Sequence, residues 1–198
     1  VGAGSSSVDW GLSVEALDYI VGSQDGSSKG LGYDIVELVE LHGNEQEKKD
    51  LWGSNRLQVG APPEHDSDGK NTDSASGVAL VLSSRAARAM QRSVPVSRRI
   101  LWAEFSGERQ PIVVVVAYAP HIGWGHAAVD KFWEQLRLTW QSLPKNAAKI
   151  LMMDANGCLG RSIGGITGPW TLYKTDNEVG AKLRQFCEEQ DLVVSSTF

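Results

Sequence analysis

The stretch Lys149-Ile150-Leu151-Met152-Met153-Asp154-Ala155-Asn156-Gly157 joins an apolar run of strand length to an acid and an amide two residues apart. In an extended strand, residues i and i+2 point to the same side, so Asp154 and Asn156 are expected to converge where the strand ends. A carboxylate and an amide at that place can hold a hard cation, a water molecule or a phosphate oxygen. The same residues are ordinary turn formers, so a strand followed by a simple Asp/Asn/Gly turn is the alternative interpretation.

Composition indicates a globular chain of 198 residues, which fits one domain with a sizeable core. Hydrophobic residues make up 41% and charged residues 22%, as in ordinary soluble proteins. The net charge of −5 argues against binding nucleic acid by bulk electrostatics, although an enzyme that meets phosphates through a bound metal is not excluded. The longest apolar run, from Ile112 to Ala117, has the length of a buried strand and is too short for a transmembrane segment.

The two cysteines, Cys158 and Cys187, show neither metal-ligand spacing nor a disulfide framework. Their pattern favours a reducing, intracellular compartment, organelles and nucleus included. The chain begins with Val1 and shows no signal peptide, so we expect a processed product or a fragment.

The apolar pattern predicts short strands first and then helices interleaved with strands, which is typical of an α/β sandwich of two sheets. Residues 1–30 are expected to be a Gly/Ser-rich N-terminal extension, and residues 31–198 a domain. Residues 42–52 suit a loop or short helix, and residues 60–76 a polar loop. Strands are expected at 31–39, 77–82, 100–105, 111–118, 149–153 and from 192 to 194, and helices at 12–21, 129–143 and 180–190.

Polar side chains follow three of the predicted strands, at Glu40, at Tyr118 and at Asp154 with Asn156. Carboxylates at such strand ends would bind Mg²⁺, which accepts few protein ligands and keeps water and substrate oxygens in its shell. The phenol of Tyr118 would donate a hydrogen bond to a phosphate oxygen as charge builds there, and Asn156 would position the phosphate or a water. The alternatives are a solvated strand end for Glu40 and a tyrosine at the edge of the core for Tyr118.

Five segments carry, in order, motifs that resemble those of one protein family. They are Leu38-Val39-Glu40-Leu41, Gly77-Val78-Ala79, Ala117-Tyr118-Ala119-Pro120, Met153-Asp154-Ala155-Asn156 and the segment from Asn177-Glu178-Val179-Gly180 to Ser196-Thr197-Phe198. The order resembles the endonuclease/exonuclease/phosphatase superfamily, most closely the endonuclease domains of non-LTR retroelements. The resemblance covers residues 31 to 198.

This resemblance implies a Mg²⁺-dependent phosphodiesterase that acts on nucleic acid or another phosphodiester. It implies that Glu40 is the metal ligand, that Tyr118 contacts phosphate, and that Asp154 with Asn156 positions the nucleophile and the phosphate. His121 follows the tyrosine motif and either lines the same pocket or belongs to a surface loop. His42 and His126 show no metal-ligand spacing, so we interpret both as structural or surface residues.

The chain also departs from the family pattern, which implies an incomplete fold without its first and last strands. Residues 1–30 contain no asparagine, whereas the family begins with a strand that carries one, and the Asp-His pair that ends the family motif is not found before Phe198. Val39 replaces a glutamine and Ala155 a phenylalanine. These differences argue against activity of the chain on its own. The alternative function is a non-catalytic structural or accessory subunit, with protein partners that cover the open sheet edges.

Overall fold

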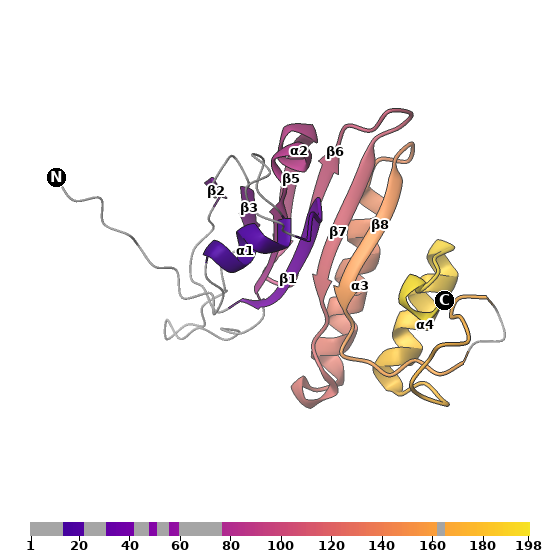
Figure 1. The fold of residues 1–198 in the computed structure, drawn as a ribbon. Helices are drawn as coiled ribbons and strands as arrows, with labels where there is room; N and C mark the ends of the chain where they lie inside the picture. Colours follow the sequence, from indigo (N-terminus) through magenta and orange to yellow (C-terminus); the bar gives the residue numbers. More distant parts are fainter. Residues whose placement is uncertain (1–13, 22–30, 42–47, 51–55, 60–76, 162–164) are drawn as a thin grey trace. The chain divides into compact units, whose positions relative to one another are not determined.

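The structure, a computed structural model, describes residues 14–21, 31–41, 48–50, 56–59, 77–161 and 165–198 (Figure 1). The chain forms two compact units, Val1–Ala117 with Pro144–Met152 and Tyr118–Leu143 with Met153–Phe198. The predicted polar loop at 60–76, His42 and most of the predicted 1–30 extension lie outside the described residues.

The first sheet has the order β1-β4-β3-β2, and its paired strands are antiparallel. Its strand β4 is buried along its whole length, and it contacts both helix α1 and strand β6 of the second sheet. Ala79 and Val81 of β4 form a cluster with Val21 of helix α1, and the apolar pattern of β4 has no polar face. The elements of this part of the first unit are α1 (Val14–Val21), β1 (Ile35–Leu41), β2 (Lys48–Asp50), β3 (Arg56–Val59) and β4 (Gly77–Leu82).

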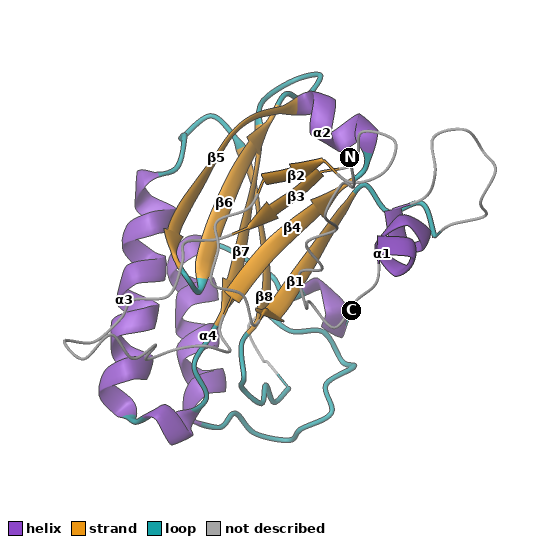
Figure 2. Ribbon diagram, turned by 90° about the vertical axis from the view of Figure 1, so that its left-hand side faces the viewer, coloured by secondary structure: helices purple, strands orange, loops and turns teal. Residues whose placement is uncertain are grey.

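The second sheet has the order β5-β6-β7-β8 (Figure 2). Strands β6 and β7 are almost entirely buried, and β5 at the edge is largely exposed or half-buried. The short helix α2 (Ser84–Ala89) precedes β5, and the Ser83 side chain caps it by accepting a hydrogen bond from Ala86 N–H. The strands are β5 (Met90–Ser97), β6 (Ile100–Phe105), β7 (Ile112–Tyr118) and β8 (Ala148–Asp154).

Strands β7 and β8 are neighbours that run in parallel. Ala148 N–H donates to Pro111 O near the start of both strands, and Ala119 N–H donates to Asp154 O at their ends, each over 2.9 Å. Parallel neighbours need a crossover connection, and helix α3 (His126–Ser142) lies between the two strands in the sequence. The carboxyl ends of β7 and β8 therefore meet at one edge of the sheet, where open α/β sheets place their ligands.

The second unit contains two parallel helices, α3 and α4 (Glu178–Gln190). Arg137 of α3 pairs with Glu189 of α4 and His126 with Glu178, in both cases across a spacing of 52 residues. This constant spacing indicates that the two helices run in the same direction, in register. Phe186 packs between two tryptophan rings of α3, 6.0 Å from Trp133 and 5.8 Å from Trp140 between ring centroids. The apolar stripe predicted for 129–143 is thus the face that α4 covers.

The predicted α/β fold with two sheets is confirmed, and so are the three predicted helices and the strands at 77–82, 100–105, 111–118 and 149–153, within three residues at each end. The strand predicted at 31–39 is displaced, because β1 begins at Ile35 and continues through Glu40. The 192–194 strand is wrong, since only the bridge from Val194 to Thr167 forms before the 3-10 turn η3 (Ser195–Thr197). Within the described residues, no helix is long and apolar enough to cross a membrane.

Helix α2 and three strands were not predicted from the sequence. Strand β2 lies inside the segment assigned to a loop or short helix, and β3 and β5 lie where no element was expected. Strand β2 has no apolar residue, and β3 alternates polar and apolar residues over only four positions. Strand β5 contains Pro95, which is tolerated at a sheet edge. These strands exist through their pairing with apolar neighbours, which a local pattern does not report.

Candidate functional site

The end of β7 forms one side of the candidate site. Tyr118 is the last residue of β7 and is buried, and Ala119 after it bonds through both of its backbone groups. Ala119 N–H donates to Asp154 O over 2.9 Å, and Ala119 O accepts from Asn156 Nδ2 over 2.8 Å. The structure thus joins Asp154 and Asn156, two of the four residues predicted from the sequence, to the residue directly after Tyr118.

The Asp154–Asn156 pair converges through a turn. Strand β8 ends at Asp154, and Asp154 Oδ1 accepts a hydrogen bond from Asn156 N–H over 2.9 Å. Asn156 has a left-handed backbone with φ of 48°, which Asn adopts more readily than most residues. The prediction that an extended strand aligns the two side chains is therefore wrong. The turn that was the alternative interpretation is what directs the Asn156 amide toward the end of β7.

The loop after Asn156 lies directly against the N-terminus of α4. The Asn177 side chain caps this helix, and its Oδ1 accepts from Gly180 N–H over 2.8 Å and from Cys158 N–H over 3.0 Å. Asn177 N–H in turn donates to Cys158 O over 3.1 Å. A Cβ on Gly180 would lie 1.9 Å from Cys158 O, so only glycine allows this approach. The Asn-x-x-Gly motif read from the sequence is thus a helix cap that also holds the loop.

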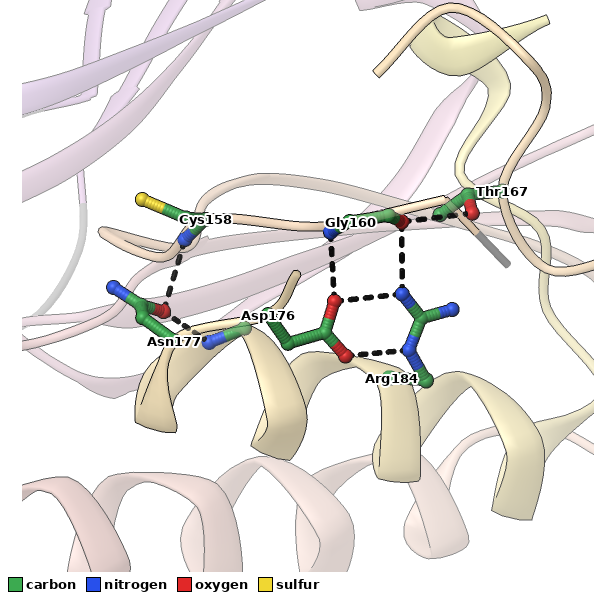
Figure 3. Close-up of polar contacts among 7 residues, drawn as sticks. Cys158, Gly160, Thr167, Asp176, Asn177 and Arg184 are labelled. Carbon is green, nitrogen blue, oxygen red and sulfur yellow. Dashed lines mark hydrogen bonds and ion pairs between the residues drawn. The ribbon is translucent and has the colours of Figure 1, made fainter. Parts of the chain in front are cut away.

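A second polar contact fixes the loop two residues further on (Figure 3). Asp176 Oδ1 accepts from Gly160 N–H over 2.7 Å, and Arg184 Nη2 donates to Gly160 O over 2.9 Å. Arg184 also donates hydrogen bonds to both carboxylate oxygens of Asp176, from Nε over 2.5 Å and from Nη2 over 2.7 Å. We call Gly160, Asp176 and Arg184 the loop clamp.

Hydrogen bonds within the loop clamp change the pKa of Asp176. The hydrogen bond from Arg184 lowers the pKa of Asp176 below its ordinary value, burial opposes this, and the Gly160 N–H lowers it further. Sequence reasoning missed both side chains. Asp176 directly precedes the cap residue and Arg184 follows eight positions later, a spacing that no helical pairing rule highlights. The only usable signal was the Asp-Asn pair before a predicted helix.

Glu40, the fourth predicted residue, belongs to the first unit. It lies in a bulge of β1, where the pairing with β4 shifts between Leu38 and Leu41, and it is exposed with φ of 59°. A Cβ on Gly77 opposite would lie 2.6 Å from Leu41 O, and Arg98 Nη2 donates to that oxygen over 3.0 Å. A left-handed glutamate is uncommon and costly, and such residues gather at functional sites. The site geometry described above is formed by second-unit residues alone.

The histidines contribute local structure. His121 is exposed, and its Nδ1 accepts from Gly123 N–H over 3.0 Å, so it caps the 3-10 turn η2 (Ile122–Trp124). His126 is a surface residue, as expected, and its Nδ1 lies 2.6 Å from Glu178 Oε1. Among the described residues, no three His, Cys, Asp or Glu side chains converge as a metal site would require.

The two cysteines differ in their surroundings. Cys187 is buried on α4, and burial raises the pKa of its thiol to about 11, which keeps it protonated and inert at neutral pH. Cys158 is half-buried in the loop after Asn156, where its backbone bonds to Asn177. Neither thiol forms a disulfide.

No family model matches this chain. Craniofacial development protein 2 of Bos taurus is 30% identical over 122 residues, which cover 61% of this chain and 20% of that protein. Craniofacial development protein 2 of Tragulus javanicus is likewise 30% identical over 122 residues, 61% of this chain and 21% of its own. This chain spans about a fifth of the length of these relatives.

Among solved structures, the endonuclease domain of TRAS1, a telomere-specific non-LTR retrotransposon, is similar to part of the chain. The match has a TM-score of 0.38 and 18% identity, and it covers 67% of this chain and 52% of that domain.

Proposed function

We propose that this chain carries the phosphate-handling part of a Mg²⁺-dependent phosphodiesterase site of the endonuclease type. The supporting observation is that Asp154 and Asn156 both bond to Ala119, directly after Tyr118, at the carboxyl ends of two parallel strands. Motifs of the endonuclease/exonuclease/phosphatase superfamily predicted these same residues in the same order.

We call the turn formed by Asp154 and Asn156 the Asp154–Asn156 corner. Its oxygen and nitrogen atoms suit the binding of a hard cation and a phosphate. Asp154 is exposed and uses one carboxylate oxygen in the turn with Asn156 N–H, which leaves the second oxygen for a cation or a metal-bound water. The bond from Asn156 Nδ2 to Ala119 O fixes the side-chain amide, so that its carbonyl oxygen is a rigidly held acceptor. Bound Mg²⁺ would polarise the phosphoryl oxygen and lower the pKa of a bound water.

The remaining roles follow from the resemblance. Glu40 would be a metal ligand, and its left-handed bulge is the local feature that favours a functional role. The phenol of Tyr118 would donate to a non-bridging phosphate oxygen, where a preorganised donor is most effective as charge develops. Asp154 would orient the attacking water, and Asn156 the phosphate.

Two replacements of Asp154 separate its charge from its role in the turn. Asp154→Asn retains an oxygen that accepts Asn156 N–H, whereas Asp154→Ala removes both the charge and the turn. We expect both variants to weaken Mg²⁺-dependent binding of a short DNA duplex by about 10- to 100-fold, since loss of a site carboxylate has effects of this size. Glu108→Ala, an exposed acid in the β6–β7 turn, is the control and should bind as the wild type does.

Nicking of supercoiled DNA in Mg²⁺ tests the chemistry with the same variants. Any nicking by the wild type should fall to background in Asp154→Ala and persist in Glu108→Ala. Duplex binding that is the same with and without Mg²⁺, and the same in all four proteins, would overturn the proposal. That result would instead favour an accessory subunit without a phosphodiesterase site.

A further inference from the structure

Three large side chains protrude from the loop that follows the candidate site. Trp170 is 75% exposed, Leu172 95% and Tyr173 50%. We call Trp170 to Tyr173 the aromatic loop. Single exposed apolar residues are common on protein surfaces, but two aromatic rings and a leucine within four positions form a patch of the kind that marks an interaction site.

The backbone next to the aromatic loop is firmly held. Trp170 N–H donates to Thr197 O over 3.0 Å, and Gly168 N–H donates to the buried Thr197 Oγ1 over 2.8 Å. A Cβ on Gly168 would lie 2.2 Å from Thr197 O, so the two segments approach as closely as glycine permits. The exposed rings are therefore presented from an anchored backbone, and little ordering is needed when a ligand binds them.

Tyr173 ties the aromatic loop to the candidate site. An interaction of its hydroxyl with the Cys158 side chain raises the pKa of Tyr173. Cys158 follows Asn156 by two residues, which span at most about 7 Å of extended chain. The exposed phenol thus lies close to the amide that is proposed to position phosphate.

The charge of this segment differs from that of the whole chain. The net charge of the protein is −5, yet the 19 residues from Gly157 to Thr175 include no acid and two bases, Arg161 and Lys174. Both bases are exposed, one on each side of the aromatic loop in the sequence. Cations beside exposed aromatic rings match the phosphates and bases of nucleic acid.

We propose that the aromatic loop is a base-stacking surface for single-stranded or locally unpaired nucleic acid, with Arg161 and Lys174 contacting the flanking phosphates. This proposal extends the proposed function, because it identifies nucleic acid as the phosphodiester held at the Asp154–Asn156 corner. Planar rings stack on any base, so the surface binds without strong sequence preference.

The test measures binding of a fluorescent single-stranded oligonucleotide, about 12 nucleotides long to cover one stacking surface, to the full chain in Mg²⁺. Trp170→Ala and Tyr173→Ala should each weaken binding about tenfold, as expected when one stacked base is lost. Tyr173→Phe removes the hydroxyl that interacts with Cys158 but retains the ring, and it should bind as the wild type does. Leu138→Ala, which removes a side chain of α3 that is 57% exposed, is the matched control.

Three results would show that the aromatic loop is not a surface for nucleic acid. Wild-type affinity in both alanine variants, or equal losses in Leu138→Ala, would overturn the proposal. Sedimentation that shows a changed oligomeric state in Trp170→Ala without weaker DNA binding would also overturn it, because the surface would then serve contacts between copies of the chain.

The same experiment separates failure of this surface from failure of the proposed metal site. If Trp170→Ala weakens binding but Asp154→Ala and Mg²⁺ removal do not, the aromatic loop is supported and the metal site is refuted. The reverse pattern overturns the aromatic loop alone.

Discussion

Two strand ends of this protein use a left-handed residue in different ways. Glu40 has φ of 59° inside the bulge of β1, and Asn156 has φ of 48° just after β8. Asn156 suits this conformation, and its backbone and side chain bond to Asp154 and Ala119. Glu40 is exposed, and a glutamate gains little from this conformation.

Asn156 therefore adopts a conformation that its own residue type favours, whereas Glu40 is held in a conformation that costs energy. The Asn156 turn is a preferred local structure that also directs an amide. The Glu40 conformation is imposed by the pairing of β1 with β4, whose Gly77 allows Leu41 to approach closely. Observed strain of this kind, at a residue singled out by its motif, favours a functional role for Glu40.

The largest expected loss of stability comes from replacing Gly180 or Gly77, the glycines that pack closely in these two regions. Gly180→Ala would place a Cβ 1.9 Å from Cys158 O, and we expect a loss of about 3 kcal/mol in unfolding free energy, despite the better helix propensity of alanine. Gly77→Ala, with a Cβ 2.6 Å from Leu41 O, should cost slightly less. Urea unfolding measures both, and stability unchanged in Gly180→Ala would contradict the close packing of this loop on α4.

The loop clamp should contribute the next largest amount. Arg184→Gln removes three hydrogen bonds, two to Asp176 and one to Gly160 O, so we expect a loss of about 2 kcal/mol. Arg137→Gln, which removes pairs with Glu134 and Glu189 at the helix surface, is the control and should cost less than about 1 kcal/mol. Equal losses in the two variants would show that the loop clamp is no stronger than an ordinary surface pair.

The loop clamp also predicts a pH dependence. The pKa of Asp176 is lowered in the folded protein, chiefly by Arg184, so its stabilisation is present above the ordinary value of 3.8 and is lost as the pH falls below it. Asp176→Asn should therefore unfold more easily than the wild type at pH 6, and the two curves should approach each other below pH 3.8. A difference that stays constant down to the lowest pH would refute the charged form of this pair.

The smallest expected changes in stability come from replacing Glu40 or Asn156 by glycine. The two changes should have opposite signs. Glu40→Gly relieves the backbone cost of a left-handed glutamate, so a gain of about 0.5 kcal/mol is expected. Asn156→Gly removes the bond to Ala119 O and should lose about 1 kcal/mol. Thermal unfolding measures both, and losses of equal size would mean that Glu40 is not strained.

Sequence reasoning succeeded where the local pattern determines the structure. The all-apolar strand at 77–82 and the apolar stripe of α3 were read correctly, because burial of those side chains drives the element. It also singled out Asp154 and Asn156, which the structure joins to Ala119 at the strand ends, since a polar residue after an apolar run stands out; the roles of Tyr118, Asp154 and Asn156 stay predictions. The Asn177 cap was visible as Asn-x-x-Gly before an amphipathic segment.

The features that sequence reasoning missed depend on contacts between distant residues. Strand β2 has no apolar residue and β3 alternates over only four residues, so both are defined by their pairing. Strand β1 extends through Glu40 because β4 pairs with Leu41. Asp176 and Arg184 hold the loop only because the fold brings Gly160 within hydrogen-bonding distance of both side chains. The Asp154–Asn156 geometry was misjudged because the side chain of Asp154 bonds to the local backbone and ends the strand.

The proposed cation site can be tested by a Mg²⁺ titration followed by the side-chain amide resonances of Asn156, because this amide is fixed at the Asp154–Asn156 corner. We expect a saturable shift in the wild type and in Glu108→Ala. In Asp154→Asn, which keeps the turn and removes the charge, the shift should disappear. A shift of the same size and midpoint in Asp154→Asn, or no shift in the wild type, would contradict a cation site at this corner.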